Sequence, residues 1–392
     1  MTFDDIIRAE KLGLRGIQSG DVIYPKEPNA DSQVIAQNIS YNTGRKDIQG
    51  AVLFYQNPPL HSIDDKALTM NIEALEKIAT KANEYQFLIV FGRNHPLHVG
   101  ADIRENYTRL SEALEQSRMP DYLQWTDYRL GKFVSLSQLI DNISQSEVIT
   151  VSIASGHPYG GSAEKIRMPD YVVTDSRMKL QLSEPSLGIM PVVGVYLLLR
   201  RTTEDNTRAI TMTANPFTAY QLLDMEVVNS VIQIDGNYAS PKNAKLAELE
   251  DDRTHGIIFP ATLDFIVEVM ESHDKLTRMQ IPSAIDTKKL EEEIGWRTNP
   301  SNYERFSGMS LRDAEKQDGW KGRPLFKPSI EAIDYLLQRM NGMSFEELRT
   351  RRDELLKLER ELDLGLYREH PKQIKIGFEA AINGTVPVFR TN

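Results

Sequence analysis

A glycine-rich turn followed by two glutamates is the part of this sequence best suited to chemistry. The apolar run at residues 148–153 predicts a buried strand, and the pairs Ser155-Gly156 and Gly160-Gly161 follow it before the helix-forming residues 163–166. Glycines at a strand-to-helix junction let backbone amides approach a ligand, and the helix N-terminus adds a partial positive charge there. The turn therefore suits an oxygen that carries or develops negative charge, although a tight turn also needs glycine for its conformation alone.

The two glutamates are Glu164, just past the glycine pair, and Glu184, in the segment SEPSLGIMP. A pair of carboxylates suits acid–base chemistry, because one can activate a water while a proton is delivered elsewhere on the substrate. The alternative is that both are ordinary glutamates on a helix and a loop.

The combination of these features resembles the crotonase (enoyl-CoA hydratase/isomerase) superfamily. The features are the glycine turn, Glu164, a Pro-Asp-plus-strand segment at residues 169–173, and Glu184 in an EPxLGIxP setting. The resemblance extends over residues 50–233. It implies an α/β fold with a crotonase-like ββα spiral core, an N-terminal extension and a long helical C-terminal region.

A second turn, GADIR at residues 100–104, follows the predicted strand at residues 87–92. It resembles the family's GAD box, and the resemblance implies that the backbone N–H groups of Ala101 and Gly161 form an oxyanion hole. Two amides from separate turns can converge on one thioester oxygen, which is what enolate stabilisation requires. The alternative for GAD is an ordinary helix-entry turn.

The sequence departs from the family pattern at several positions. Ser162 replaces the third glycine of the usual GGG, and Glu226 replaces the glycine at the head of the later GlVn segment. His98, His157 and Tyr159 stand beside the presumed oxyanion hole. Histidine titrates near neutrality and could act as a base in the C–C bond hydrolysis of a 1,3-diketone. We interpret these three side chains as packing or substrate-shaping residues.

Composition excludes several other classes of protein. A net charge of −10 argues against nonspecific binding to nucleic acid or to anionic membranes, although it leaves room for a local basic pocket for a phosphate-bearing ligand. There is no cysteine, so disulfides, a thiol nucleophile and a cysteine-based metal site are excluded. No HExxH, Walker or GxGxxG motif occurs, and we expect no metal and no cofactor beyond the coenzyme A of the substrate. The first residues lack the pattern of a signal peptide, and we expect a cytoplasmic protein.

The chain of 392 residues is longer than one average domain. We expect an N-terminal extension at residues 1–45, loosely ordered or packed as an arm, a crotonase-like core at residues 46–243, and a helical region at residues 244–392. Apolar residues recur at helical spacing in residues 330–337 and 348–366. Family members use C-terminal helices to complete a neighbouring subunit's site, so the resemblance implies a homotrimer or hexamer, and these apolar faces would need a partner surface. The charges along residues 348–366 indicate a solvated helix face, with a short coiled-coil contact as the alternative.

The function expected from the resemblance is that of an acyl-CoA-processing enzyme, most simply a 2-enoyl-CoA hydratase, because both glutamates are present. A hydrolase or isomerase on the same fold is the first alternative. A catalytically silent assembly subunit is the second.

Overall fold

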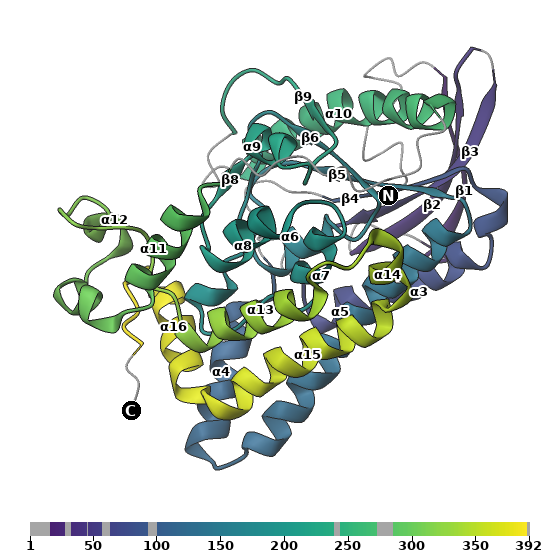
Figure 1. Ribbon diagram of the computed structural model, residues 1–392. Coiled ribbons are helices and arrows are strands. Elements are labelled where there is room, and N and C mark those ends of the chain that lie inside the picture. The colour runs from purple at the N-terminus through teal and green to yellow at the C-terminus, as the bar shows by residue number, and fades with distance from the viewer. Residues whose placement is uncertain are drawn as a thin grey trace. The chain divides into compact units, whose positions relative to one another are not determined.

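The computed structural model describes residues 16–27, 33–44, 46–56, 63–92, 100–238, 244–272 and 285–389. The chain divides into two compact units, each assembled from three separate segments. Figure 1 labels the helices and strands of the chain. The first unit comprises Met1–Gly100, Ser135–Leu180 and Phe217–Thr277, and the second comprises Ala101–Val134, Gln181–Pro216 and Arg278–Asn392. These units cut across the expected boundaries at residues 45 and 243, which remain predictions.

The first unit is built on a mixed seven-stranded sheet with the strand order β1-β2-β3-β4-β5-β6-β9. The first three strands are antiparallel neighbours, and β3 to β9 are parallel. The strands are β1 (Ile17–Tyr24), β2 (Val34–Asn42), β3 (Asp47–Tyr55), β4 (Phe87–Gly92), β5 (Ile149–Ala154), β6 (Tyr171–Asp175) and β9 (Ser230–Ile232). All of β4 is buried, as expected for a parallel strand covered on both faces. The predicted α/β class is confirmed.

The N-terminal segment is part of this sheet. β1 and β2 form an antiparallel hairpin, and β2 pairs with the whole of β3 from Val34 opposite Tyr55 to Asn42 opposite Asp47. The expectation of a loosely ordered extension is therefore wrong for these two strands, and the packed arm is the correct alternative. The edge strand β1 carries the run Gln18-Ser19-Gly20-Asp21 between its apolar residues, and this run weakened the apolar signal.

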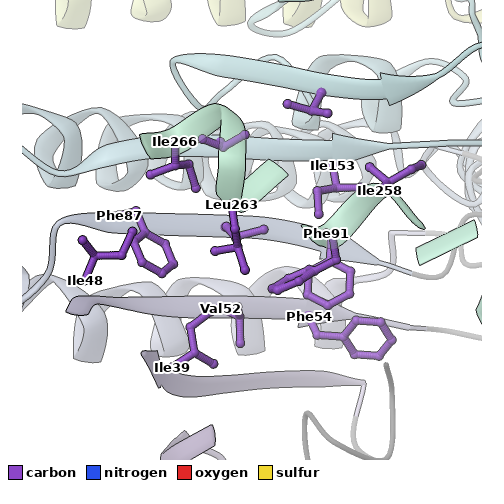
Figure 2. Close-up of a cluster of buried hydrophobic side chains, with 14 of the residues drawn as sticks. Ile39, Ile48, Val52, Phe54, Phe87, Phe91, Ile153, Ile258, Leu263 and Ile266 are labelled. Carbon is purple, nitrogen blue, oxygen red and sulfur yellow. The ribbon is translucent and has the colours of Figure 1, made fainter. Parts of the chain in front are cut away.

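The core of the first unit lies between the sheet and α10 (Ala244–Ser272). Figure 2 shows Leu263 pointing from this helix toward the side chains of the strands. The ring of Phe91 lies 5.0 Å from that of Phe54 and 5.6 Å from that of Phe259, measured between centroids. Full burial of a side chain of this size stabilises the fold by about 1.5–3 kcal/mol. The cluster therefore holds β4 and β5 firmly, and the turns that follow them start from fixed strand ends.

Shorter elements complete the first unit. They are α3 (Asp65–Ala79), η1 (Ala82–Glu84), the end of α5 (Met119–Gln145), α6 (Gly161–Lys165), β7 (Lys179–Leu180), β8 (Phe217–Thr218) and α9 (Ala219–Asp224). α3 packs against β1, β2 and β3. Its N-cap is Asp64, whose carboxylate accepts from the amide of Ala67 at 2.7 Å. No helix in the described ranges is both long and apolar enough to cross a membrane.

The second unit is helical. Its elements are α4 (Ile103–Glu115), the start of α5, η2 (Glu184–Ser186), α7 (Gly194–Leu199), α8 (Glu204–Met212), α11 (Thr287–Arg297), η3 (Pro300–Phe306), α12 (Leu311–Ala314), α13 (Lys327–Met340), α14 (Phe345–Thr350), α15 (Arg352–Glu369) and α16 (Pro371–Asn383). Within this unit α13 and α15 pack against each other and against α7, and α16 packs against α4. The long helical C-terminal region is thus confirmed.

The apolar faces of these C-terminal helices are covered inside the unit. Ile333, Leu336 and Leu337 of α13 are fully buried, as is Leu356 of α15. The inference that these faces need the surface of another subunit is therefore wrong, because the chain itself supplies that surface. A homotrimer or hexamer remains a prediction that rests on the resemblance alone.

Candidate active site

The turn after β5 has the strand–turn–helix order that the sequence predicts. Gly156 and Gly160 have φ angles of +73° and +51°, which favour glycine, and Gly161 opens α6. Gly100, from the other glycine turn, lies directly against this pair. A Cβ atom at Gly100 would come within 2.7 Å of the Gly161 nitrogen and 2.8 Å of the Tyr159 carbonyl oxygen. The two glycine turns therefore meet at a point where no side chain fits.

Glu164 lies in the first turn of α6. Its amide donates to the Gly160 carbonyl at 3.1 Å, and its side chain is only 2% exposed. The alternative of a surface glutamate on a helix is therefore wrong for this residue. The structure thus places a buried carboxylate within one helical turn of the glycine contact.

Tyr238 anchors the start of the same turn. Its hydroxyl accepts from the Gly156 amide at 2.6 Å and donates to the Asp175 carboxylate at 2.5 Å. Asp175 is the last residue of β6 and also accepts from the amide and Nε of Arg177, at 2.8 and 3.2 Å. Burial, followed by the charge of Asp175, raises the pKa of Tyr238, so that the phenol stays protonated. The turn is thus held by an ordered polar network.

His157 and Tyr159 lie beside Tyr238. The imidazole stacks on the Tyr159 ring at 6.5 Å and meets the Tyr238 ring edge-on at 5.9 Å. Burial, and then the charge of Lys179, lowers the pKa of His157, while Asp175 opposes that shift. His157 is therefore neutral near pH 7, and a neutral imidazole can accept a proton.

Lys165 is a buried cation next to Glu164 in the chain. Its ammonium donates to the Asn71 amide oxygen at 3.3 Å and lies 4.1 Å from the centroid of the Tyr55 ring. Burial lowers its pKa to about 7. No pattern in the sequence indicated that this lysine is buried.

Glu184 belongs to the second unit, in η2, and is 6% exposed. Its carbonyl accepts from the amides of Leu187 at 2.8 Å and Ile189 at 3.2 Å. The next carbonyl, that of Pro185, accepts from the amide of Phe326 at 2.9 Å. The segment that carries Glu184 is therefore fixed by backbone bonds, one of them from the N-cap of α13.

A surface hollow of about 290 Å³ lies between α4 and α16 in the second unit. Its lining residues are Arg104, Tyr107, Thr108, Glu379, Ile382 and Asn383. The ammonium of Lys375 lies 5.7 Å from the centroid of the Tyr107 ring. The hollow is thus lined by one cation, one carboxylate and an aromatic ring, and the ammonium of Lys375 lies over that ring.

The candidate residues are distributed over both units. Gly161, Glu164, His157 and Tyr159 are brought together in the first unit, whereas Ala101 and Glu184 belong to the second. Ala101 directly follows Gly100 in the chain. The pairing of Glu164 with Glu184 remains a prediction, and His98 lies outside the described residues.

The sequence model of the enoyl-CoA hydratase/isomerase family matches residues 50–237. The match contains both glycine turns and both glutamates. Residues 50–237 are a crotonase-superfamily domain. Among curated relatives, the fatty acid oxidation complex subunit alpha of Idiomarina loihiensis is 27% identical over 175 residues, which are 44% of this chain and 22% of that protein. The matched segment thus spans about a fifth of that relative.

Solved crotonase-type structures share the fold of this chain. An enoyl-CoA hydratase from Rhodobacter sphaeroides has a TM-score of 0.54 at 16% identity, over 87% of this chain and 90% of its own. A carnitinyl-CoA dehydratase from Mycobacterium thermoresistibile has a TM-score of 0.52 at 15% identity, over 86% of this chain and 87% of its own. At such identities the likeness shows the fold alone.

The crotonase pattern places glycine where this chain has Glu226. The φ angle of Glu226 is +59°, in the left-handed region that favours glycine. Burial raises the pKa of its carboxyl group. A non-glycine residue therefore adopts a left-handed conformation here, at a cost of about 1–2 kcal/mol.

Proposed function

We propose that this crotonase-type acyl-CoA enzyme is most simply a 2-enoyl-CoA hydratase. The observation that carries the proposal is the contact between Gly100 and Gly161, with Glu164 buried one turn away. We assign the oxyanion hole to the amides of Ala101 and Gly161. The contact supports this pairing, because Ala101 is the next residue after Gly100.

In the proposed reaction Glu164 and Glu184 share one catalytic water. One carboxylate takes a proton from the water as it attacks Cβ, and a proton reaches Cα as the enolate collapses. The negative charge that develops on the thioester oxygen is held by the two amides, and removing one such donor typically costs about 10²- to 10³-fold in rate. Coenzyme A enters only as part of the substrate, and we propose no other cofactor and a cytoplasmic location.

We assign the hollow between α4 and α16 to a phosphate group of the coenzyme A. Arg104 and Lys375 supply positive charge there, while Glu379 limits how much negative charge the site accepts. Arg104→Ala should raise KM several-fold and leave kcat unchanged, because this contact is equal in the ground and transition states. An unchanged KM would contradict the assignment of this phosphate site, and it would leave the proposed catalytic role of the two glutamates unaffected.

The test of the reaction begins with a panel of enoyl-, diketo- and hydroxyacyl thioesters, with products identified by mass. Glu164→Gln and Glu184→Gln should each lower kcat by about 10²- to 10⁴-fold with little change in thioester affinity. The double variant should lose little more than either single variant, because groups that act as a unit are lost together. Glu76→Gln, on the exposed side of α3, is the control. Losses well below 10²-fold for both glutamates would show that the site is wrongly assigned.

A hydrolase is the second candidate, and the neutral, half-buried His157 favours it. In that case His157→Ala should cost more activity than one of the two glutamate variants. A catalytically silent assembly subunit would give no heat of binding when titrated with a nonhydrolysable acyl-CoA.

A further inference from the structure

Three buried polar side chains form a stripe along α15 at four-residue spacing. They are Glu359, Asp363 and Tyr367, which are 0%, 1% and 4% exposed. Residues four apart lie on one face of a helix, so the three point in the same direction. We expected the charged residues of this helix to lie on a solvated face. For Glu359 and Asp363 that expectation is wrong. Because a buried carboxylate is costly unless hydrogen-bonded, the stripe needs partners.

Glu359 finds its partners at the start of α7. One carboxylate oxygen accepts from the Val195 amide at 2.9 Å, and the other accepts from the Tyr196 amide at 3.3 Å. The first amides of a helix have no partner within the helix, so this carboxylate satisfies two of them. Glu359 therefore fixes α7 to α15.

Asp363 binds the backbone of the segment that carries Glu184. Its carboxylate accepts from the Met190 amide at 3.1 Å. The residue before Met190 is Ile189, whose own amide donates to the Glu184 carbonyl at 3.2 Å. One short run of backbone thus connects Asp363 with the segment that carries Glu184.

Tyr367 is the third residue of the stripe and is 4% exposed. Burial raises the pKa of Tyr367, and the charges of Asp363 and Glu184 add to the rise while Arg129 opposes it. The Tyr122 ring, from α5, lies 6.0 Å away. The phenol therefore lies within electrostatic reach of Glu184, among groups from three helices.

The next helix closes the same segment from another side. A Cβ atom at Gly377 of α16 would lie 2.3 Å from the Leu187 carbonyl oxygen. Gly188 also lies close to α16, because a Cβ atom there would come within 3.2 Å of the Cα of Ile374. The C-terminal helices therefore leave the Glu184 segment little freedom to shift.

We propose that the stripe Glu359–Asp363–Tyr367 positions Glu184 for catalysis, and that it does so within the same chain. These residues lie outside the family match at residues 50–237. The inference rests on the proposed catalytic role of Glu184. It makes Asp363 and Glu359 positioning residues, because they act on the backbone and do not touch the substrate.

Asp363→Ala tests the positioning role, with Asp363→Asn as the conservative variant. The alanine variant should lower kcat by about 10- to 100-fold with KM within two-fold, because a small misplacement of a catalytic group costs about 10²-fold. The asparagine variant keeps an oxygen acceptor and should recover most of that loss. Glu361→Ala is the matched control, since Glu361 lies on the exposed side of the same helix. Equal kcat for wild type and Asp363→Ala would overturn the proposal.

Hydrogen exchange provides a readout that does not depend on the reaction. The Met190 amide should exchange at least ten-fold faster in Asp363→Ala and about five-fold faster in Asp363→Asn, because a neutral acceptor is weaker than a carboxylate. If the alanine variant does not fold, the asparagine variant carries the test alone, and an unchanged Met190 rate contradicts the inference. If Glu184→Gln keeps full activity, the proposed function fails. The exchange rate of the Met190 amide still tests the hydrogen bond between Met190 and Asp363.

Mixing two impaired variants tests whether the stripe acts within one chain. Glu184→Gln and Asp363→Ala chains are unfolded together and refolded as a mixture. If Asp363 served the Glu184 of another chain, intact pairs would form and activity would rise above the sum of the separate variants. We expect no such rise, and its appearance would overturn the intramolecular assignment.

Discussion

Replacing Lys165 by Met should change how the stability of the protein depends on pH. Burial lowers the pKa of Lys165 from 10.5 to about 7 in the folded chain. Between these values the unfolded chain binds more protons than the folded chain, so the free energy of unfolding rises with pH. Below pH 7 both states are protonated, and the cost of the buried charge is fully present.

The size of the effect follows from the two pKa values. From pH 7 to pH 9 the folded chain loses the half proton that it still binds, while the unfolded lysine stays charged. Linkage then gives a rise of about 2 kcal/mol. The lysine is in contact with the Asn71 amide oxygen and the Tyr55 ring in the folded chain. With the folded pKa at about 7, we expect the full rise of about 2 kcal/mol in wild type.

Lys165→Met keeps the length of the side chain and removes the charge. Urea unfolding at pH 7 and pH 9 measures the effect. We choose circular dichroism over tryptophan fluorescence, because Lys165 belongs to the first unit whereas Trp125, Trp296 and Trp320 all belong to the second. The variant should be more stable than wild type at pH 7 and should lose the rise of about 2 kcal/mol.

Lys77→Met is the matched control for this experiment. Lys77 also belongs to the first unit and lies 4.8 Å from the centroid of the Tyr24 ring, but it is exposed. Its replacement should leave the pH dependence unchanged. A Lys165→Met protein that is less stable than wild type at pH 7, and equally dependent on pH, would refute the reasoning.

Further predictions concern stability, the oxyanion turn and assembly. Glu226→Gly should raise the free energy of unfolding by up to about 1 kcal/mol, because φ is +59° there, and urea unfolding measures it. Leu263→Ala should lower the same quantity by about 2–5 kcal/mol, since the side chain is fully buried in the core of the first unit. Tyr238→Phe removes the hydroxyl that joins Gly156 to Asp175, so the Gly156 amide should exchange at least ten-fold faster with solvent. Light scattering at micromolar concentration should give the mass of a trimer or hexamer, and a monomeric mass would contradict that expectation.

The sequence predicted the elements that carry continuous apolar runs. The strands β3 to β6 were predicted from short continuous apolar runs, and the turn before α6 from the glycines that follow β5. Glu164 and Glu184 were predicted as site residues only through the family motif. Their burial is a tertiary property that spacing alone does not report.

Residues whose roles depend on distant partners were missed. Tyr238 serves the turn at Gly156, 82 residues earlier in the chain, and no local pattern marks it. The stripe on α15 did leave a signal, since Glu359, Asp363 and Tyr367 stand four residues apart. That signal was lost among the charges of neighbouring positions, because a carboxylate that caps a helix and one that faces water look alike in sequence.

The discontinuous second unit has a consequence for how the chain folds during synthesis. Residues 181–216 leave the ribosome long before α16, which ends at Asn383 and completes the same unit. At about 5–20 residues per second, roughly 10–30 s separate the two events. During that interval the apolar side chains of α7 lack the helices that cover them, so the nascent chain exposes a surface that chaperones bind. We expect a protein released at residue 243 to keep this exposure, because α13 and α15, which pack against α7, would be missing.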